Sequence, residues 1–231
     1  MKDSLFKFPS TPHLITLEGV EVRDDKVLSE SERTDFLKHE LVIEEKVDGA
    51  NLGISFDSEG SLFLQNRGSY IHLPGVGQWK KLDQWLNPKI SAIFETIIDR
   101  YILFGEWCYA QHSVFYNRLP DWFLGFDLYD KQAKKFLSVR RRDGLFEQMG
   151  IHKVPQLSIG HYSFSKIQQL LAQSKISDEP AEGLYLRIDQ GDWLLQRAKL
   201  VRSSFIQSVD EHWSRLAIKP NQLNPNRWLN G

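Results

Sequence analysis

The chain has 231 residues, of which 41% are hydrophobic and 26% are charged, and its formal net charge at pH 7 is −1. These values are typical of an ordinary soluble enzyme with one large domain or two small ones, and no overall positive field favours nucleic acid, so such a partner must meet a local patch. The one cysteine, Cys108, excludes an internal disulfide and a cysteine-rich zinc site, and we expect it to be a small buried side chain. No stretch approaches the ~20 apolar residues that span a membrane, and residues 1–10 lack the apolar run of a secretory signal, so we expect a cytoplasmic protein.

Residues 1–40 are polar and mixed, and a serine at position 29 predicts a capped short helix over 29–39. The sequence Glu-Glu-Lys-Val-Asp-Gly-Ala-Asn then stands between two apolar runs, which predicts a β-hairpin with its turn at Asp48-Gly49. Alternate side chains of a strand share a face, so Glu44, Lys46 and Asp48 are expected to point the same way. An ammonium between two carboxylates at a strand end is either a surface ion pair or a nucleophilic lysine beside metal-binding acids.

Further strands and helices alternate along the rest of the chain. Alternating apolar residues predict strands over 61–68, 101–107, 122–129, 182–187 and 193–201, with a turn at 190–192. Helical spacing predicts two helices over 78–98, split by Pro88, and further helices over 140–149, 163–175 and 205–216. An irregular loop is expected over 109–120. Strands and helices joined by hairpin turns indicate an α+β fold with antiparallel sheets.

Charged residues that suit phosphate chemistry fall on strands far apart in the chain. A lysine attacks only when deprotonated, and nearby positive charge promotes the loss of a proton whose free pKa is near ~10.4. Arg197 and Lys199 are two apart on a late strand and share a face, which predicts a cationic clamp. Asp48 and Glu182 are suitable oxygen ligands for a divalent ion and its water. With Lys46, this set suits in-line attack on a nucleotide phosphorus.

The order of these residues resembles the motifs of the covalent nucleotidyltransferases, which include ATP-dependent ligases and mRNA-capping enzymes. Lys46-Val47-Asp48-Gly49 is similar to the Lys-x-Asp-Gly signature of that family. The other motifs follow in family order within residues 44–199: Arg67-Gly68 (motif Ia), Phe104-Gly105-Glu106-Trp107 (motif III), Phe126-Asp127 (motif IIIa), Glu182 to Arg187 (motif IV) and Arg197-Ala198-Lys199 (motif V). The form of the first and third of these motifs resembles the RNA ligase 2 type most.

The resemblance implies an ATP-dependent RNA ligase that works in three steps. Lys46 would attack the α-phosphate of ATP, expel pyrophosphate and carry AMP, which would pass to a 5′-phosphate end before a 3′-hydroxyl displaces it. By position, the family roles fall as follows: Asp48 and Glu182 hold the water shell of Mg²⁺ or Mn²⁺, Lys199 grips the α-phosphate, Glu45 lies beside adenine, Phe126 stacks on adenine, Asp127 organises the pocket from behind, Glu106 binds the ribose, and Asn51 and Arg67 contact ribose or phosphate. Arg197 replaces the usual lysine of motif V and either contacts phosphate or packs against Trp193.

We therefore expect residues 1–231 to form a single adenylation domain with the ATP-grasp-like nucleotidyltransferase fold, its antiparallel sheets flanked by helices. Residues 1–40 would pack on it as an extension, and residues 203–231 would form a short helical tail. About thirty residues follow the last motif, too few for the five-stranded oligonucleotide-binding barrel, so no such domain is expected.

The expected partners are RNA ends, in a nicked duplex or a broken RNA, together with an end-healing kinase or phosphatase and a second copy of the chain. A DNA or hybrid-strand ligase, an end-activating adenylyltransferase, the use of GTP and a nucleotide-binding adaptor without turnover remain alternatives. His112 either touches nucleic acid or packs its loop. The run Arg140-Arg141-Arg142 is interpreted as a solvated face, with contact to backbone phosphates as the other reading.

Overall fold

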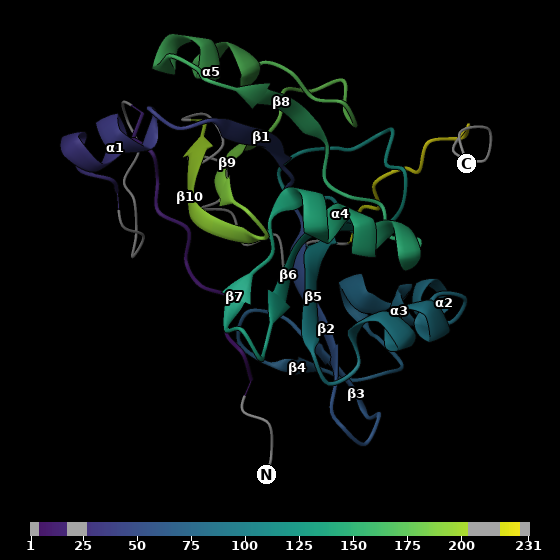
Figure 1. The fold of residues 1–231 in the computed structure, drawn as a ribbon. Helices are drawn as coiled ribbons and strands as arrows, with labels where there is room; N and C mark the ends of the chain where they lie inside the picture. Colours follow the sequence, from purple (N-terminus) through teal and green to yellow (C-terminus); the bar gives the residue numbers. More distant parts are fainter. Residues whose placement is uncertain (1–4, 18–26, 203–217, 227–231) are drawn as a thin grey trace.

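The structure is a computed structural model that describes residues 5–17, 27–202 and 218–226. Its strands form two antiparallel sheets (Figure 1). The four-stranded sheet has the order β10 (Trp193–Val201), β9 (Gly183–Gln190), β1 (Leu41–Lys46) and β8 (Gln156–Gly160). The six-stranded sheet has the order β4 (Tyr70–Ile71), β3 (Leu62–Gln65), β2 (Ala50–Phe56), β5 (Tyr101–Trp107), β6 (Phe123–Asp130) and β7 (Lys135–Phe136).

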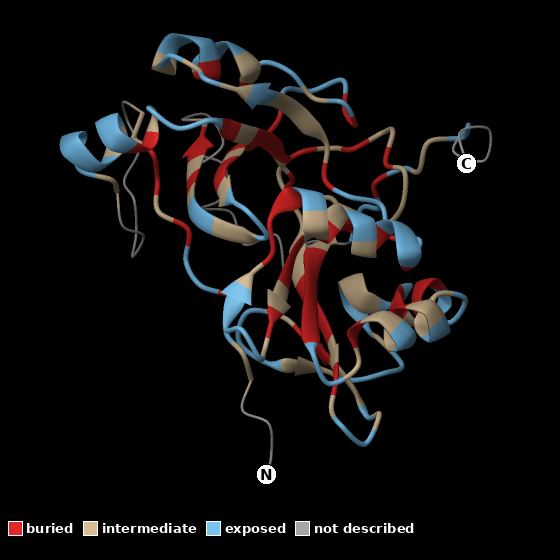
Figure 2. Cartoon of the chain, viewed as in Figure 1, coloured by how far each residue is buried: buried red, intermediate tan, exposed pale blue. Residues whose placement is uncertain are grey.

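Helices cover the outer face of each sheet. The elements are α1 (Glu30–Phe36), a 3₁₀ turn η1 (Gly77–Trp79), α2 (Leu82–Leu86), α3 (Ile90–Ile97), α4 (Val139–Gln148) and α5 (Phe164–Leu170). Apolar side chains of α1 and α5 pack on the four-stranded sheet, and those of α2, α3 and α4 pack on the six-stranded sheet. Figure 2 shows the buried residues concentrated in the strands between these helices. None of the helices in the described ranges is long and apolar enough to cross a bilayer.

The predicted β-hairpin at Asp48-Gly49 is wrong, because its two strands belong to different sheets. β1 pairs with β8 and β9, whereas β2 pairs with β3 and β5. The chain crosses from one sheet to the other at Gly49, where a Cβ atom would lie 2.7 Å from the carbonyl oxygen of Trp107. Glycine allows this close approach, since any side chain would meet the β5 backbone. The crossing places the end of β1, with Lys46, at the junction of the sheets.

Most of the other local predictions are confirmed. The helix over 29–39 exists as α1, and Ser29 caps it with its side chain in a capping box with Glu32. The helices on either side of Pro88 and the final β9–β10 hairpin are present, and Cys108 is fully buried. The predicted helix over 163–175 ends at Leu170, and the short strand β8 was not predicted.

The two ends of the chain are described in part. Residues 5–17 run along the junction of the sheets, with Phe8 in one apolar cluster and Leu14 in another. The helix predicted over 205–216 lies outside the described residues. The described part of the expected tail, residues 218–226, is extended and pairs with the loop after β5.

Candidate functional site

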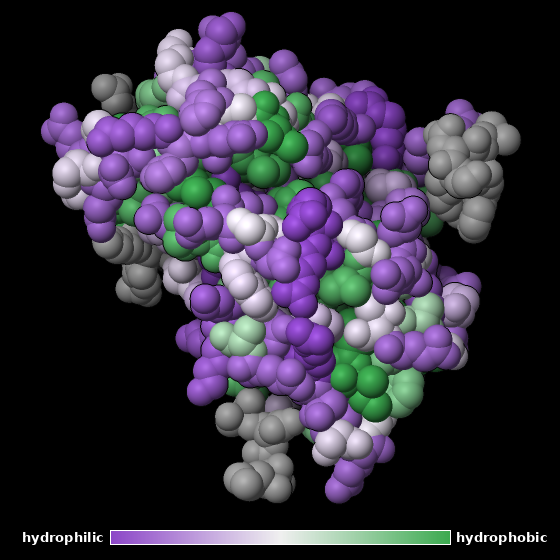
Figure 3. Space-filling view, viewed as in Figure 1, coloured by the Kyte–Doolittle hydropathy of each residue, from purple (hydrophilic) through white to green (hydrophobic). Residues whose placement is uncertain are grey.

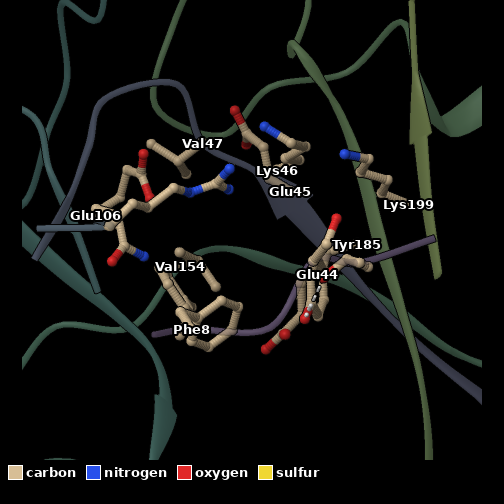
Figure 4. A pocket seen from close by; sticks show the side chains of 14 residues that line it. Phe8, Glu44, Glu45, Lys46, Val47, Glu106, Val154, Tyr185 and Lys199 are labelled. Atoms are coloured by element: carbon tan, nitrogen blue, oxygen red, sulfur yellow. Dashed lines mark hydrogen bonds between the residues drawn. The ribbon is translucent and has the colours of Figure 1, made fainter. Parts of the chain in front are cut away.

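The cleft between the two sheets contains most of the side chains singled out from the sequence. Two adjoining cavities, of about 90 and 300 Å³, meet where β1 ends and β2 begins. The predicted residues that line one or both of them are Glu45, Lys46, Asp48, Asn51, Arg67, Glu106, Phe126, Glu182 and Lys199. Figure 4 shows Lys46 and Lys199 on one wall of the first cavity and Glu106 on the other. The cleft therefore gathers residues from β1, β2, β5, β6, β9 and β10.

Lys46 is held by carboxylates from both sheets. It is the last residue of β1 and pairs in register with Gly183, which brings Glu182 beside it. Lys46 Nζ donates a hydrogen bond to Glu182 Oε1. Burial alone lowers the pKa of Lys46, but the carboxylates of Glu182, Glu106 and Asp48 outweigh burial and raise that pKa above its ordinary value. These carboxylates therefore favour the ammonium form of Lys46.

Two of the acidic side chains have strongly displaced pKa values. Burial raises the pKa of Glu106 to about 8, against the opposing effect of Lys46. Burial likewise raises the pKa of Glu182 to about 7, again opposed by Lys46. The Glu182 carboxylate also raises the pKa of Glu106, and the Asp48 carboxylate raises the pKa of both. Arg67 lowers the pKa of Glu106 and Lys199 lowers that of Glu182, but neither cancels the rise, so a further cation beside these two carboxylates would be stabilised.

Asp48 is fixed by the loop after β5. Its Oδ2 atom accepts hydrogen bonds from the backbone N–H groups of Ser113 at 2.7 Å and Val114 at 3.1 Å. Its own N–H donates to the hydroxyl of Tyr116 at 2.7 Å. His112 packs in the same loop, with Nε2 3.1 Å from Gln78 Oε1 and Nδ1 3.9 Å from Asp48 Oδ1. The loop therefore determines where the Asp48 carboxylate points.

The acidic residues fit a divalent cation that arrives with a substrate. Glu182 Oε2 is buried and has no hydrogen-bond partner among the described residues, although Oε1 accepts a hydrogen bond from Lys46. No group of three or more His, Cys, Asp or Glu side chains in the described ranges is arranged to hold a metal alone. Magnesium and manganese are commonly bound through one or two carboxylates, water and substrate phosphates. Glu182 and Asp48 meet that requirement.

The aromatic side of the cleft is supported from behind by buried charges. Phe126 lines the first cavity, while its neighbour Asp127 points away and is fully buried. Asp127 accepts hydrogen bonds from Arg187 at 2.6 Å and Arg197 at 3.1 Å. The guanidinium of Arg197 lies 4.6 and 4.5 Å from the ring centroids of Phe8 and Phe136. Arg197 thus pairs with Asp127 and packs on the rings of Phe8 and Phe136; packing against Trp193 was one of the two alternatives for it.

Glu45 turns away from the lysine beside it. Its carboxylate is 1% exposed and accepts hydrogen bonds from the Ser174 hydroxyl at 2.7 Å and the Lys175 N–H at 3.1 Å. Burial raises the pKa of Glu45, and the hydrogen bond from Ser174 opposes that rise. The side chain ties the end of β1 to the loop after α5.

The interpretation of Arg140-Arg141-Arg142 as a solvated face is wrong for its third residue. Arg142 is fully buried and donates to Glu44 Oε1 at 2.6 Å and to the carbonyl oxygen of Phe126 at 2.6 Å. Arg140 is exposed, and Figure 3 shows a strongly hydrophilic surface over α4. A signal was present in the sequence: Val139, Arg142 and Phe146 form one helical stripe, and all three are buried. Arg142 occupies a core position of that stripe.

Sequence reasoning assigned no role to several other lining residues. Phe8, Ser10 and Thr11 line the first cavity from the N-terminal segment, and Val154 and Tyr185 also line it. The hydroxyl of Thr11 lies 3.4 Å from that of Tyr185. Tyr185 belongs to motif IV, whereas Phe8, Ser10, Thr11 and Val154 stand in no recognisable motif, and the topology brings the segment of residues 5–17 into the cleft.

Comparison with known proteins identifies similar chains. The family model described as RNA ligase matches residues 39–201. Among solved structures, a mutant Naegleria gruberi RNA ligase with ATP and Mn has a TM-score of 0.59 and 16% identity, over 78% of this chain and 54% of that one. An apo mutant has a TM-score of 0.59 and 18% identity, over 75% and 52%, and the ligase with PPi has 0.56 and 18%, over 77% and 52%. A search of curated proteins found no match.

These likenesses bear first on the fold. At such identities they confirm the predicted α+β nucleotidyltransferase architecture with its antiparallel sheets. The chain spans about half the length of the solved relatives that it matches. Residues 39–201 contain every sequence motif described above.

Proposed function

The chain belongs to the RNA ligase family, and from this membership we propose that it is an ATP-dependent RNA ligase that joins 5′-phosphate and 3′-hydroxyl ends through AMP carried on Lys46. The observation that carries the proposal is the contact between Lys46 and Glu182 at the junction of the sheets, in a cleft shared with Asp48, Glu106 and Lys199. An amine, acidic ligands and a second cation are the groups that attack on a phosphate requires.

In the proposed first step, Lys46 Nζ forms a bond to the α-phosphorus of ATP, and the bond to the β-phosphate oxygen breaks to release pyrophosphate. Lys199, from the same wall, would neutralise charge on the α-phosphate. A divalent ion held through Asp48 and Glu182 would neutralise phosphate charge. With that positive charge beside it, Glu182 would stabilise the ammonium form of Lys46 less strongly, which would lower the pKa of Lys46.

The remaining residues would orient the nucleotide. Phe126 presents its side chain to the first cavity, where an adenine ring can stack on it. Glu106 and Asn51 lie opposite each other on β5 and β2, and Asn51 Oδ1 is buried with no hydrogen-bond partner in the part of the chain that the structure describes, so both can bind ribose hydroxyls. Arg67 is exposed at the edge of both cavities, where it can reach phosphate. In the later steps AMP passes to the 5′-phosphate end, and the 3′-hydroxyl displaces it.

Labelling with ATP tests the proposal directly. The protein is incubated with α-labelled ATP and Mg²⁺ or Mn²⁺, denatured and analysed for covalently bound label. Label is expected on the wild type and none on Lys46→Ala, whereas Lys38→Ala, which removes an exposed lysine in an i,i+3 pair with Asp35, should label normally. Absence of label on the wild type with either ion would contradict the proposal and favour a nucleotide-binding adaptor.

Sealing assays then define the substrate. Matched nicked duplexes of RNA, DNA and hybrid strands, each with one labelled 5′-phosphate, should be joined when the nick is in RNA. Accumulation of adenylated ends without joining would instead indicate an end-activating adenylyltransferase. The proposal includes a cytoplasmic location, ends prepared by a kinase or phosphatase, and a homodimer that grips both ends. Measuring the mass of the protein with and without nicked RNA tests the homodimer.

A further inference from the structure

Residues 218–226 are hydrogen-bonded along the loop that follows β5. This segment lies outside the part of the chain matched by the family model. Its backbone exchanges hydrogen bonds with residues 108–119, here called the cleft loop: Gln111 N–H to Lys219 O at 2.7 Å, Asn221 N–H to Tyr109 O at 3.0 Å, Gln222 N–H to Tyr116 O at 2.8 Å, Leu119 N–H to Gln222 O at 3.1 Å and Asn224 N–H to Leu119 O at 2.7 Å. In Figure 1 the segment, in yellow, runs beside this loop.

One side chain in the segment bonds to both ends of the bend in the cleft loop. Asn221 is 3% exposed. Its Nδ2 atom donates to the carbonyl oxygens of Cys108 at 2.8 Å and Ala110 at 3.2 Å. Its Oδ1 atom accepts from the N–H of Tyr116 at 2.9 Å. The Asn221 amide therefore supplies hydrogen-bond partners to three backbone groups of the loop. Because buried backbone groups need such partners, Asn221 sets the spacing between the two parts of the loop.

The same loop holds the aspartate of the lysine motif. Between the two points that Asn221 bridges, the N–H groups of Ser113 and Val114 donate to Asp48 Oδ2. At the second of those points, Tyr116 accepts the N–H of Asp48 through its hydroxyl. A change in the curvature of the loop would therefore move both the amides and the hydroxyl that fix Asp48, two residues from Lys46.

We propose that Asn221 is a positioning residue for lysine adenylation, which acts through the cleft loop on Asp48. The inference rests on the proposed function, because Asp48 matters to the rate only if Lys46 carries AMP. Removing the Asn221 side chain leaves two carbonyl oxygens and one N–H of the loop unpaired in a buried place. The loop must then shift to satisfy them, and Asp48 moves with it.

The test compares Asn221→Ala with the full-length wild type in single-turnover adenylation across a range of Mn²⁺ concentrations. The variant should form lysyl-AMP roughly 10- to 100-fold more slowly, the loss that misplacement by about 1 Å produces. Its half-saturating Mn²⁺ concentration should rise, while its affinity for AMP without metal stays at the wild-type value. Amide exchange at Ser113 and Val114 should accelerate, and exchange at Leu186 in β9 should not change.

Matched controls separate this role from general stability. Asn226→Ala removes the same side chain from an exposed position in the same segment and should leave every readout at wild-type values. If Asn221→Ala does not fold, Tyr116→Phe replaces it, since that change removes the hydroxyl bonded to Asp48 and should raise the half-saturating Mn²⁺ concentration.

The outcomes distinguish the two proposals. A wild type that takes no label refutes the proposed ligase and with it this inference. A labelled wild type, combined with wild-type rate, metal dependence and amide exchange in Asn221→Ala, overturns the inference alone. The same result in Tyr116→Phe overturns it where Asn221→Ala does not fold.

Discussion

Replacement of Arg142 by methionine should destabilise the protein by about 3–5 kcal/mol, because it removes the guanidinium that is hydrogen-bonded to a buried carboxylate. Arg142 is fully buried, and its Nη1 and Nη2 atoms donate to the two oxygens of Glu44 at 3.3 and 2.6 Å. Glu44 is also fully buried, and among the described residues its carboxylate has no other hydrogen-bond partner. Methionine fills much of the space of arginine, so the change removes charge more than volume.

The expected loss is large for a chain of this size. A change of 1 kcal/mol shifts the melting temperature by about 2–4 °C in a domain of 150–250 residues, so the loss corresponds to roughly 6–20 °C. Arg140→Met is the matched control: Arg140 is on the same helix, its side chain is 82% exposed, and it forms an ion pair with Asp192. An exposed pair contributes at most about 1 kcal/mol.

Urea denaturation followed by circular dichroism gives both free energies of unfolding. Adding Glu44→Gln to Arg142→Met should recover part of the loss, since an unpaired amide costs less to bury than an unpaired charge. A loss for Arg142→Met no larger than that for Arg140→Met would refute the reasoning, because it would mean that Glu44 reaches water or another partner. No recovery in the double variant would refute the assignment of the cost to the stranded carboxylate.

Two further predictions concern the cleft. The melting temperature of the metal-free protein should fall from pH 6 to pH 9. Folding raises the pKa of Glu182 from 4.5 to about 7 and that of Glu106 from 4.5 to about 8. The stability that each group adds is therefore fully present below pH 4.5 and is lost as the pH rises through the pKa of the folded state. Glu106→Gln should flatten this fall, and an equally steep fall in that variant would contradict it. Phe126→Ala should raise the ATP concentration that half-saturates adenylation by roughly 5- to 150-fold, the equivalent of the ~1–3 kcal/mol of a stacked base, and an unchanged value would exclude stacking on Phe126.

Local signals in the sequence predicted local structure well. The serine cap at position 29 predicted α1, and Pro88 predicted the break between α2 and α3, because capping and the missing proline N–H act within a few residues. The β9–β10 hairpin followed from the turn at residues 190–192. The hairpin predicted at Asp48-Gly49 from the same kind of pattern is wrong. An Asp-Gly pair between apolar runs specifies a bend, but the partners of β1 and β2 are set by strands that lie far along the chain.

The ligase motifs indicated candidate residues that line the cleft. Residues that only tertiary contacts bring to the cleft were not predicted. Motif order identified Lys46, Glu106 and Glu182 as candidates from the sequence alone, and these residues line one cavity. Side-chain direction did not follow from motif order: Arg197 belongs to motif V, yet it pairs with Asp127 behind the cavity wall. A motif predicts which strand a residue belongs to. The register of that strand and the neighbouring strands determine which side chains the residue contacts.

The buried polar contacts show why the support of the site was harder to predict than the site itself. Arg142 reaches Glu44 across 98 residues of chain, and Asn221 reaches Cys108 across 113, so no periodicity or turn pattern connects either pair. The two differ in one respect. An arginine in an apolar helical stripe has to find a buried acid, because the cost of desolvating a lone charge exceeds what the helix could recover. The position of Arg142 in an apolar stripe therefore indicates that it has a buried acidic partner, but not which one. An asparagine in a polar, irregular segment can be hydrogen-bonded equally well by water, so its sequence position indicates no buried partner.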